Sequence, residues 1–293
     1  MVAQARLYGA NVVIRAGRRI LVNRLVLTAS ALAAASGLVM LGWILGDVAI
    51  KGFQAVNWEF FTELPAPPGM TGGGLANAIV GTLVMTLAAA VMAVPFGVMA
   101  GTWLSEFGRE SGFGKMVRYL SDILVSAPSI VVGVFVYLIM VRPMGHFSGW
   151  AGAVSLAIIM VPVVSRTTEE MLKLVPHELR EAALALGAPY WKIMAQVIYR
   201  AAAAGMVTGI MLAVARVAGE TAPLLFTALN SPYWMHGMNE PMGNLTVTMF
   251  NYAMSPYDDW QTMAWGAALL ITAGVLATTF TTRLILRLRS VVH

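Results

Sequence analysis

Six long apolar runs constrain this chain more than any other feature. Each is close to or above the roughly 20 residues that a helix needs to cross a hydrocarbon core about 30 Å thick. The fifth run is unusual because it contains Arg216 and Glu220. The runs cover residues 25–46, 75–104, 123–141, 146–165, 201–229 and 263–282. They predict an all-α integral membrane protein with six transmembrane helices.

The composition agrees with a membrane protein and excludes several other classes. Of the 293 residues, 58% are hydrophobic and 11% are charged, whereas a typical soluble domain carries about 25% charged residues. This argues against a soluble enzyme, a disordered chain and a nucleic-acid-binding domain. The chain has no cysteine, which excludes disulfides, thiolate metal sites and cysteine nucleophiles.

The first run could be a secretory signal peptide, because a basic stretch precedes it and small residues, 33–36, offer a cleavage site. Its apolar part is longer than the usual 7–15 residues or so of a signal sequence. We therefore interpret it as a retained spanning helix. This divides the chain into a basic N-terminal tail, residues 1–24, and a six-helix domain, residues 25–293.

The distribution of Lys and Arg predicts the orientation. Of the 19 basic residues, 16 fall in the tail, two alternate loops and the C-terminus, and Lys51 and Arg142 fall on the opposite side. The sixteen are Arg6, Arg15, Arg18, Arg19, Arg24, Arg109, Lys115, Arg118, Arg166, Lys173, Arg180, Lys192, Arg200, Arg283, Arg287 and Arg289. Cytoplasmic loops carry such an excess, so we expect both termini in the cytoplasm. The net charge of +5 then reflects topology, with the lipid bilayer as surroundings and no nucleic-acid partner.

Two long loops are expected on the extracytoplasmic side. The loop at 51–74 is rich in proline and glycine, which predicts an irregular structure. The loop at 230–262 contains aromatic residues of the kind that gather at membrane interfaces. Within it, residues 245–254 carry no charge, and we predict a short helix or re-entrant piece that dips into the protein.

A polar segment at 166–200 is predicted to be a cytoplasmic loop that contains a helix with clear ends. Pro176 suits a helix start, residues 177–186 follow with helical spacing, and Gly187 suits the C-terminal end. Two interpretations remain open from the residues alone. The helix either covers its own bundle or lies in the groove of a cytoplasmic partner.

Arg216 and Glu220 are four residues apart and therefore share a helix face. If the span begins near Gly205, a rise of about 1.5 Å per residue places Arg216 near the middle of the membrane. The two side chains form either an internal ion pair that joins helices or part of an ion pathway, because charges at this depth are usually functional. A planar guanidinium suits an oxyanion because it donates paired hydrogen bonds.

Arg166 is a second candidate, at the cytoplasmic end of the fourth run. It is either a basic anchor paired with Glu169 or Glu170, or the inner exit of an anion path. The four histidines lack metal-binding spacing, and no serine in a run has a histidine near it. We therefore predict no metal site, no catalytic residues and no covalent chemistry in this chain.

The polar segment resembles the EAA loop of ABC-importer permeases, which reads Glu-Ala-Ala, three residues, Gly, nine residues, then Ile-x-Leu-Pro. Here Glu181, Ala182, Ala183 and Gly187 match, whereas the final Leu-Pro pair is replaced in 197–200. The resemblance implies that this loop docks into a cleft of a separate ATPase subunit. The residues assigned to this coupling are Glu178, Arg180, Glu181, Ala182, Ala183 and Gly187.

A second motif is more specific. Residues 216–224, Arg-Val-Ala-Gly-Glu-Thr-Ala-Pro-Leu, resemble the Arg-x-x-Gly-Glu-Thr-Ala-Pro signature of phosphate-import permeases. Residues 165–172, 81–86 and 95–97 resemble other spans of that family, and the likeness covers about 72–289. On this basis the chain is identified as a member of the PstA-type permeases of phosphate-specific ABC importers. The signature adds Thr221 to Arg216, Glu220 and Arg166 as expected pathway residues.

The resemblance implies a type I ABC-importer permease fold, also called MetI-like, in the bacterial inner membrane. It implies three partners: a PstC-type second permease, a PstB-type ATPase dimer and a PstS-type periplasmic phosphate receptor. ATP and Mg would bind the ATPase, since this chain has no Gly-x4-Gly-Lys-Ser/Thr loop. The alternatives are the same machine for sulfate, molybdate or phosphonate, a six-span channel or ion-coupled carrier working alone, and a membrane hydrolase.

Overall fold

The computed structural model describes residues 2–290, so Met1 and residues 291–293 of the predicted tail and permease domain lie outside it. It divides into two compact units, Met1–Ile50 and Lys51–His293, which are described separately. The first unit holds most of the helix α1, Val2–Ala55, which continues from the basic tail into the first predicted span without a break. Its apolar side chains, such as Leu32 and Trp43, are exposed.

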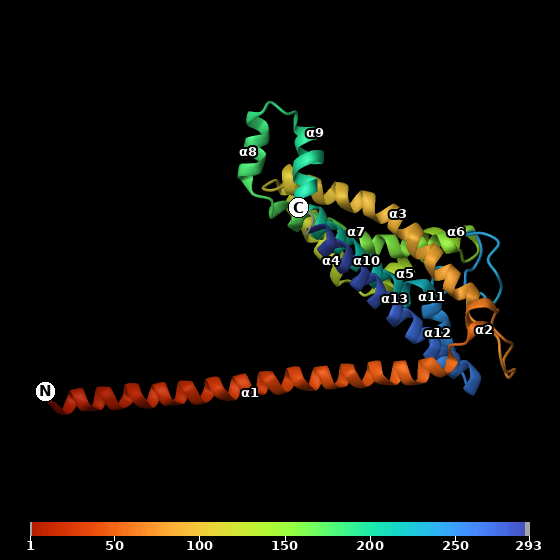
Figure 1. Cartoon of the computed structure of the whole chain (residues 1–293), viewed down its shortest axis with the longest axis horizontal. Coiled ribbons are helices and arrows are strands. Elements are labelled where there is room, and N and C mark those ends of the chain that lie inside the picture. The colour runs from red at the N-terminus through yellow and green to blue at the C-terminus, as the bar shows by residue number, and fades with distance from the viewer. Residues whose placement is uncertain (1, 291–293) are drawn as a thin grey trace. The chain divides into compact units, whose positions relative to one another are not determined.

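The second unit is a bundle of helices, as Figure 1 shows. Its α-helices are α2 Trp58–Thr62, α3 Ala76–Glu106, α4 Gly112–Ser126, α5 Ser129–Val136, α6 Arg142–Met144, α7 Gly149–Lys173, α8 His177–Ala185, α9 Tyr190–Ile193, α10 Tyr199–Ala218, α11 Ala222–Leu225, α12 Leu245–Ala253 and α13 Asp258–Ser290. Two π-helical turns, η1 Tyr137–Val141 and η2 Met194–Ile198, complete the set.

Within the described residues, five helices are long and apolar enough to cross a membrane, and a bent pair adds a sixth span if it is counted as one. This confirms the predicted all-helical fold with six spans. The helix α12, Leu245–Ala253, also confirms the short helix expected in the second extracytoplasmic loop.

The third predicted span, 123–141, is not one straight helix. The helices α4 and α5 meet at an angle of 101°, because Ala127 and Pro128 adopt extended backbone with ψ near 138° and 129°. A residue that precedes proline is disfavoured in the α region. The apolar length of the run concealed this break, and the predicted third span is present as a bent pair of helices, Gly112–Ser126 and Ser129–Met144.

The fifth span also differs from the prediction of 201–229. It begins at Tyr190 and ends at Ala218, so it starts eleven residues earlier than predicted, in the polar segment 166–200, and also ends eleven residues earlier. Gly219 lies at its C-terminal end, and Pro223 begins the separate short helix α11. A glycine followed by a proline is a common helix stop.

The helix α7 is the centre of the bundle. It is the most buried of the spanning helices: 67% of its most apolar stretch is buried, against 28% for α3. The close approach of α3 depends on two glycines, because a Cβ on Gly97 or Gly101 would lie 2.7 Å or less from Val164 or the Ser165 carbonyl. These contacts align α3 and α7 along their length.

The N-terminal end of α3 packs against the helix α12. The Thr82 Oγ1 accepts a hydrogen bond of 2.8 Å from the Leu245 backbone N–H, and Gly81 lies directly against the Gly243 carbonyl. This explains why the sequence places Gly and Thr together at 81–82. The loop after α11 is thereby held against the bundle.

We expect Gly81→Val to destabilise the bundle, because its Cβ would lie 2.0 Å from the Gly243 carbonyl oxygen. Overpacking of this kind costs about 1–3 kcal/mol. Thermal unfolding of the purified chain in detergent would measure it. The control is Gly274→Val on α13, where a Cβ meets nothing within 4 Å. Equal melting temperatures for the two variants would show that the close contact between Gly81 and Gly243 does not stabilise the bundle.

Candidate translocation and coupling sites

Arg216 occupies the last turn of α10, where the helix ends before Gly219. Its side chain is 50% exposed in the second unit, and that of Glu220 is 17% exposed. The Arg216 Nε and Glu220 Oε1 are 3.9 Å apart. This is an ion pair at a distance too long for a hydrogen bond, so the guanidinium keeps donors available.

The backbone around Glu220 is more firmly held than its side chain. Its N–H donates to the Val217 carbonyl at 3.1 Å, and its carbonyl accepts a hydrogen bond of 2.9 Å from Thr246 Oγ1. Thr246 is 1% exposed and belongs to α12. The helix α12 therefore holds the backbone at Glu220, four residues after Arg216.

The neighbours of Arg216 show its height in the bundle. Ala215 and Ala218 line a groove of about 310 Å³ together with Thr86 of α3 and Ile271 of α13. The helix α10 runs antiparallel to α7, because a Cβ on Gly205 or Gly209 would lie 2.2 Å or less from Met171 or Thr167. Arg216, seven residues beyond Gly209, is therefore level with the middle of α7, Gly149–Lys173. Arg216 therefore lies near the mid-height of these spanning helices.

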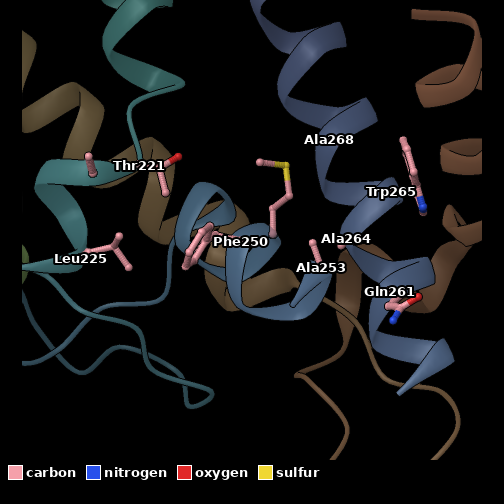
Figure 2. Close-up of a pocket in the computed structure, with 10 residues that line it drawn as sticks. Thr221, Leu225, Phe250, Ala253, Gln261, Ala264, Trp265 and Ala268 are labelled. Atoms are coloured by element: carbon pink, nitrogen blue, oxygen red, sulfur yellow. The ribbon is translucent and has the colours of Figure 1, made fainter. Parts of the chain in front are cut away.

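Thr221 follows the break and lines a different cavity, of about 600 Å³. Figure 2 shows Thr221 on one wall, Phe250 of α12 between, and Gln261 and Trp265 of α13 on the other side. Most of the lining is apolar, with the Thr221 hydroxyl, the Gln261 amide and the Trp265 indole as the polar groups. Thr221 thus opens onto space between α11, α12 and α13.

Arg166 lies inside α7 rather than at its end, because that helix continues to Lys173. The side chain is 57% exposed and donates to Asp122 of α4 at 2.5 Å and to Glu170 at 3.1 Å. One of the two expected partners, Glu170, is therefore present. Asp122, which the sequence placed only at the start of the third run, is the second.

Glu169 does not pair with Arg166. Its side chain is 7% exposed and accepts from Arg118 at 2.7 Å and from Lys173 at 2.5 Å. These charges surround a small cavity of about 160 Å³ between α4 and α7. Local spacing identified Glu169 as a partner of Arg166, but it could not reveal Arg118, which is 51 residues away in the sequence.

The helix α8 matches the helix predicted at 177–186 to within one residue. Figure 1 shows α8 and α9 together at one end of the bundle. Glu178, Glu181 and Ala182 are exposed, and Ala183 is half-buried against the apolar cluster beneath. The exposed surface continues to Leu186, which is 87% exposed.

Gly187 follows α8 with φ +73°, and a Cβ there would meet nothing within 4 Å. Left-handed backbone of this kind favours glycine, which is why the motif carries glycine at this position. Its N–H donates to the Leu184 carbonyl at 2.9 Å. The residue ends the helix and leaves open space above it.

Arg180 differs from the other residues expected in the coupling group, because it points toward the bundle. Its side chain is 15% exposed and donates to Glu106 Oε1 at 2.9 Å, and it also donates to the Leu172 carbonyl at 3.0 Å. Glu106 was not identified from the sequence. No local pattern connects the two residues, which are 74 positions apart.

A family model described as "Binding-protein-dependent transport system inner membrane component" matches residues 93–290. The chain is 50% identical over 263 residues to the "Phosphate transport system permease protein PstA" of Yersinia pestis, covering 90% of this chain and 89% of that one. It is 49% identical to the protein of the same name from Pasteurella multocida, covering 88% of this chain and 92% of that one.

A solved structure of the MetNI methionine ABC transporter in an inward-facing conformation has the same fold, with a TM-score of 0.62. The match covers 73% of this chain and 94% of that chain at 21% sequence identity, which supports the fold alone. The family model and the two relatives carry the assignment further. The chain belongs to the binding-protein-dependent transport system inner membrane components and, within them, to the PstA family of phosphate transport system permeases.

Proposed function

We propose that this chain is the membrane-spanning permease subunit of an ATP-driven importer that moves inorganic phosphate across the bacterial inner membrane by alternating access. The observation that carries the proposal is Arg216, a half-exposed cation near the mid-height of the spanning helices. The names of the curated relatives point to the same cargo.

An exposed arginine at this height cannot be accounted for by lipid contact. A charge at the centre of a bilayer costs roughly 2.5–3.5 kcal/mol on insertion scales. The exposed half of the Arg216 side chain therefore faces water or another protein chain. A guanidinium there can donate paired hydrogen bonds to two oxygens of a phosphate ion.

One chain leaves Arg216 open on one side, so the proposal includes a PstC-type second permease that completes the path. The pathway residues are Arg216, Glu220 and Thr221, with Arg166 nearer the cytoplasm. Glu220, 3.9 Å from Arg216, keeps the empty path close to neutral. Arg166 is already paired with Asp122 and Glu170, so the anion has to compete with those carboxylates on its way out.

The remaining partners are a PstB-type ATPase dimer and a PstS-type periplasmic receptor. Support for the ATPase comes from α8, whose outer residues Glu178, Glu181 and Ala182 are exposed and leave a surface free for docking. ATP and Mg would be held by that dimer. Its closure moves α8 and opens the outward side, the receptor delivers the anion, and the reset releases the anion inward.

The test is uptake of labelled phosphate at low micromolar concentration in cells that lack this gene, with and without the gene restored. We expect restoration to return uptake, and excess sulfate, molybdate or phosphonate to leave it unchanged. Competition by one of those anions would reassign the cargo. Restored uptake without an ATPase in the gently purified complex would favour a carrier that works alone.

The orientation with both termini in the cytoplasm is part of the proposal and has its own prediction. The chain contains no cysteine, so a single introduced cysteine is a unique label site. We expect Gly72→Cys, in the loop 51–74, to react with a membrane-impermeant maleimide in intact cells. Leu186→Cys, after α8, should react only after lysis, and the reverse pattern would overturn the orientation.

A further inference from the structure

Glu106 is a buried carboxylate that joins three helices. It is the last residue of α3, and its side chain is 3% exposed. One oxygen accepts from Arg180 of α8 at 2.9 Å, and the other accepts from the Tyr190 hydroxyl of α9 at 2.5 Å. The Ser105 hydroxyl also donates to it at 3.2 Å. The carboxylate therefore links α3 to both α8 and α9.

The helix α8 has few other attachments to the bundle. None of its residues is fully buried, and Ala183 is its member of the apolar cluster beneath. Arg180 also donates to the Leu172 carbonyl of α7 at 3.0 Å, and His177 has an exposed hydrogen-bond contact of 3.3 Å with Arg109. Because hydrophobic burial is small, the buried pair of Glu106 and Arg180 makes a large contribution to the position of α8.

A chain of direct contacts leads from Glu106 to the region of Arg216. The helix α3, which contains Pro95 in its interior but continues from Ala76 to Glu106, connects Glu106 with Thr82, whose hydroxyl accepts from the Leu245 N–H at 2.8 Å. Thr246, the next residue of α12, donates to the Glu220 carbonyl at 2.9 Å. A shift of α8 can therefore reach the region of Arg216 by two routes. One is the continuous polypeptide through α9 and α10, and the other passes from Glu106 through α3 and α12.

We propose that Glu106 is a positioning residue for energy coupling: it ties α8 to α3 so that movement of the coupling helix reaches the translocation path. This inference rests on the proposed function, in which α8 is moved by an ATPase. Glu106 itself touches neither phosphate nor ATP. Its loss leaves the ATPase docked but weakens the mechanical link between α8 and α3.

The experiment uses the complete importer, with both permeases, the ATPase and the receptor, reconstituted in proteoliposomes. The readout is phosphate imported per ATP hydrolysed. We expect Glu106→Gln to lower this ratio at least about fivefold in a complex of unchanged subunit composition, because the charge that holds Arg180 is lost. Tyr190→Phe should lower it less. The control is Glu110→Gln, an exposed carboxylate close to Glu106 in the chain.

A rescue experiment separates positioning from charge chemistry. In this cysteine-free chain, Glu106→Cys with Arg180→Cys removes the pair, and a short bifunctional maleimide joins the two positions again. We expect the untreated double variant to be uncoupled and the cross-linked one to recover at least half of the wild-type ratio. No recovery after complete cross-linking overturns the proposal.

The remaining outcomes are also informative. An unchanged ratio for Glu106→Gln, in vesicles whose wild-type complex imports phosphate, contradicts this inference alone. Wild-type vesicles that hydrolyse ATP but import no phosphate contradict the proposed function instead. If Glu106→Gln and Tyr190→Phe both prevent assembly, Glu106 acts in folding, and the positioning role is overturned.

Discussion

Arg216→Ala is expected to reduce phosphate uptake by roughly 10-fold to more than 100-fold while the importer still assembles. A charge-assisted hydrogen bond contributes about 1.5–3 kcal/mol, and each 1.4 kcal/mol or so corresponds to a factor of ten. In the wild-type protein Glu220 lies 3.9 Å from Arg216. Without Arg216, its carboxylate is an uncompensated negative charge in the path. Initial uptake rates at low phosphate, with complex yield measured in parallel, give the result.

Two further variants separate these effects. Arg216→Ala with Glu220→Gln removes the repulsion as well as the cation, so we expect partial recovery if repulsion contributes. Arg142→Ala is the matched control, because Arg142 is an exposed cation in the short helix α6. Uptake by Arg216→Ala equal to that of Arg142→Ala would remove Arg216 from the pathway.

Gly187→Trp is expected to prevent stable association with the ATPase and, as a result, to abolish uptake. The space above Gly187 is open in this chain, and in the importer the docked ATPase is expected to lie there. A tryptophan also has to adopt φ +73°, which costs about 1–2 kcal/mol for a residue with a Cβ. Co-purification of the ATPase with the variant permease measures the association.

The strain and the bulk can be distinguished. Asparagine tolerates left-handed backbone better than most residues, so Gly187→Asn should retain most of the association. Gly145→Trp is the matched control, because Gly145 has φ +76° and open space but lies after α6 rather than in the coupling loop. An importer that keeps its ATPase with Gly187→Trp would show that the docking surface lies elsewhere.

The sequence predicted best where a local signal decides the structure. The helix α8 lies between Pro176 and Gly187, and these two residues are local signals for the start and the end of a helix. The spacing of Arg216 and Glu220 predicted that they lie close together, and they are 3.9 Å apart. The expected shared helix face was wrong, because α10 ends at Ala218 and Glu220 lies beyond it. The spans followed from apolar length, and the described residues contain five such helices, or six if the bent pair of α4 and α5 is counted as one span.

The sequence failed where the structure depends on distant partners. The pairs of Arg166 with Asp122, Arg118 with Glu169 and Arg180 with Glu106 join residues that are 44, 51 and 74 positions apart. No spacing rule identifies such contacts in a single sequence. The sequence analysis therefore grouped Arg180 with the coupling residues of α8, although its guanidinium is directed into the bundle.

The 101° break between α4 and α5 limits which side of the third span can meet lipid. Ending one helix and beginning another leaves backbone N–H and C=O groups without helical partners, and hydrocarbon offers none. The Ser126 hydroxyl and the Ala127 N–H both donate to the Ile123 carbonyl at 2.9 Å, and the Val131 N–H donates to the Pro128 carbonyl at 2.9 Å. The other backbone groups at the break would be costly to leave unpaired in hydrocarbon, so we expect this side of the third span to face water or a neighbouring chain rather than the acyl chains.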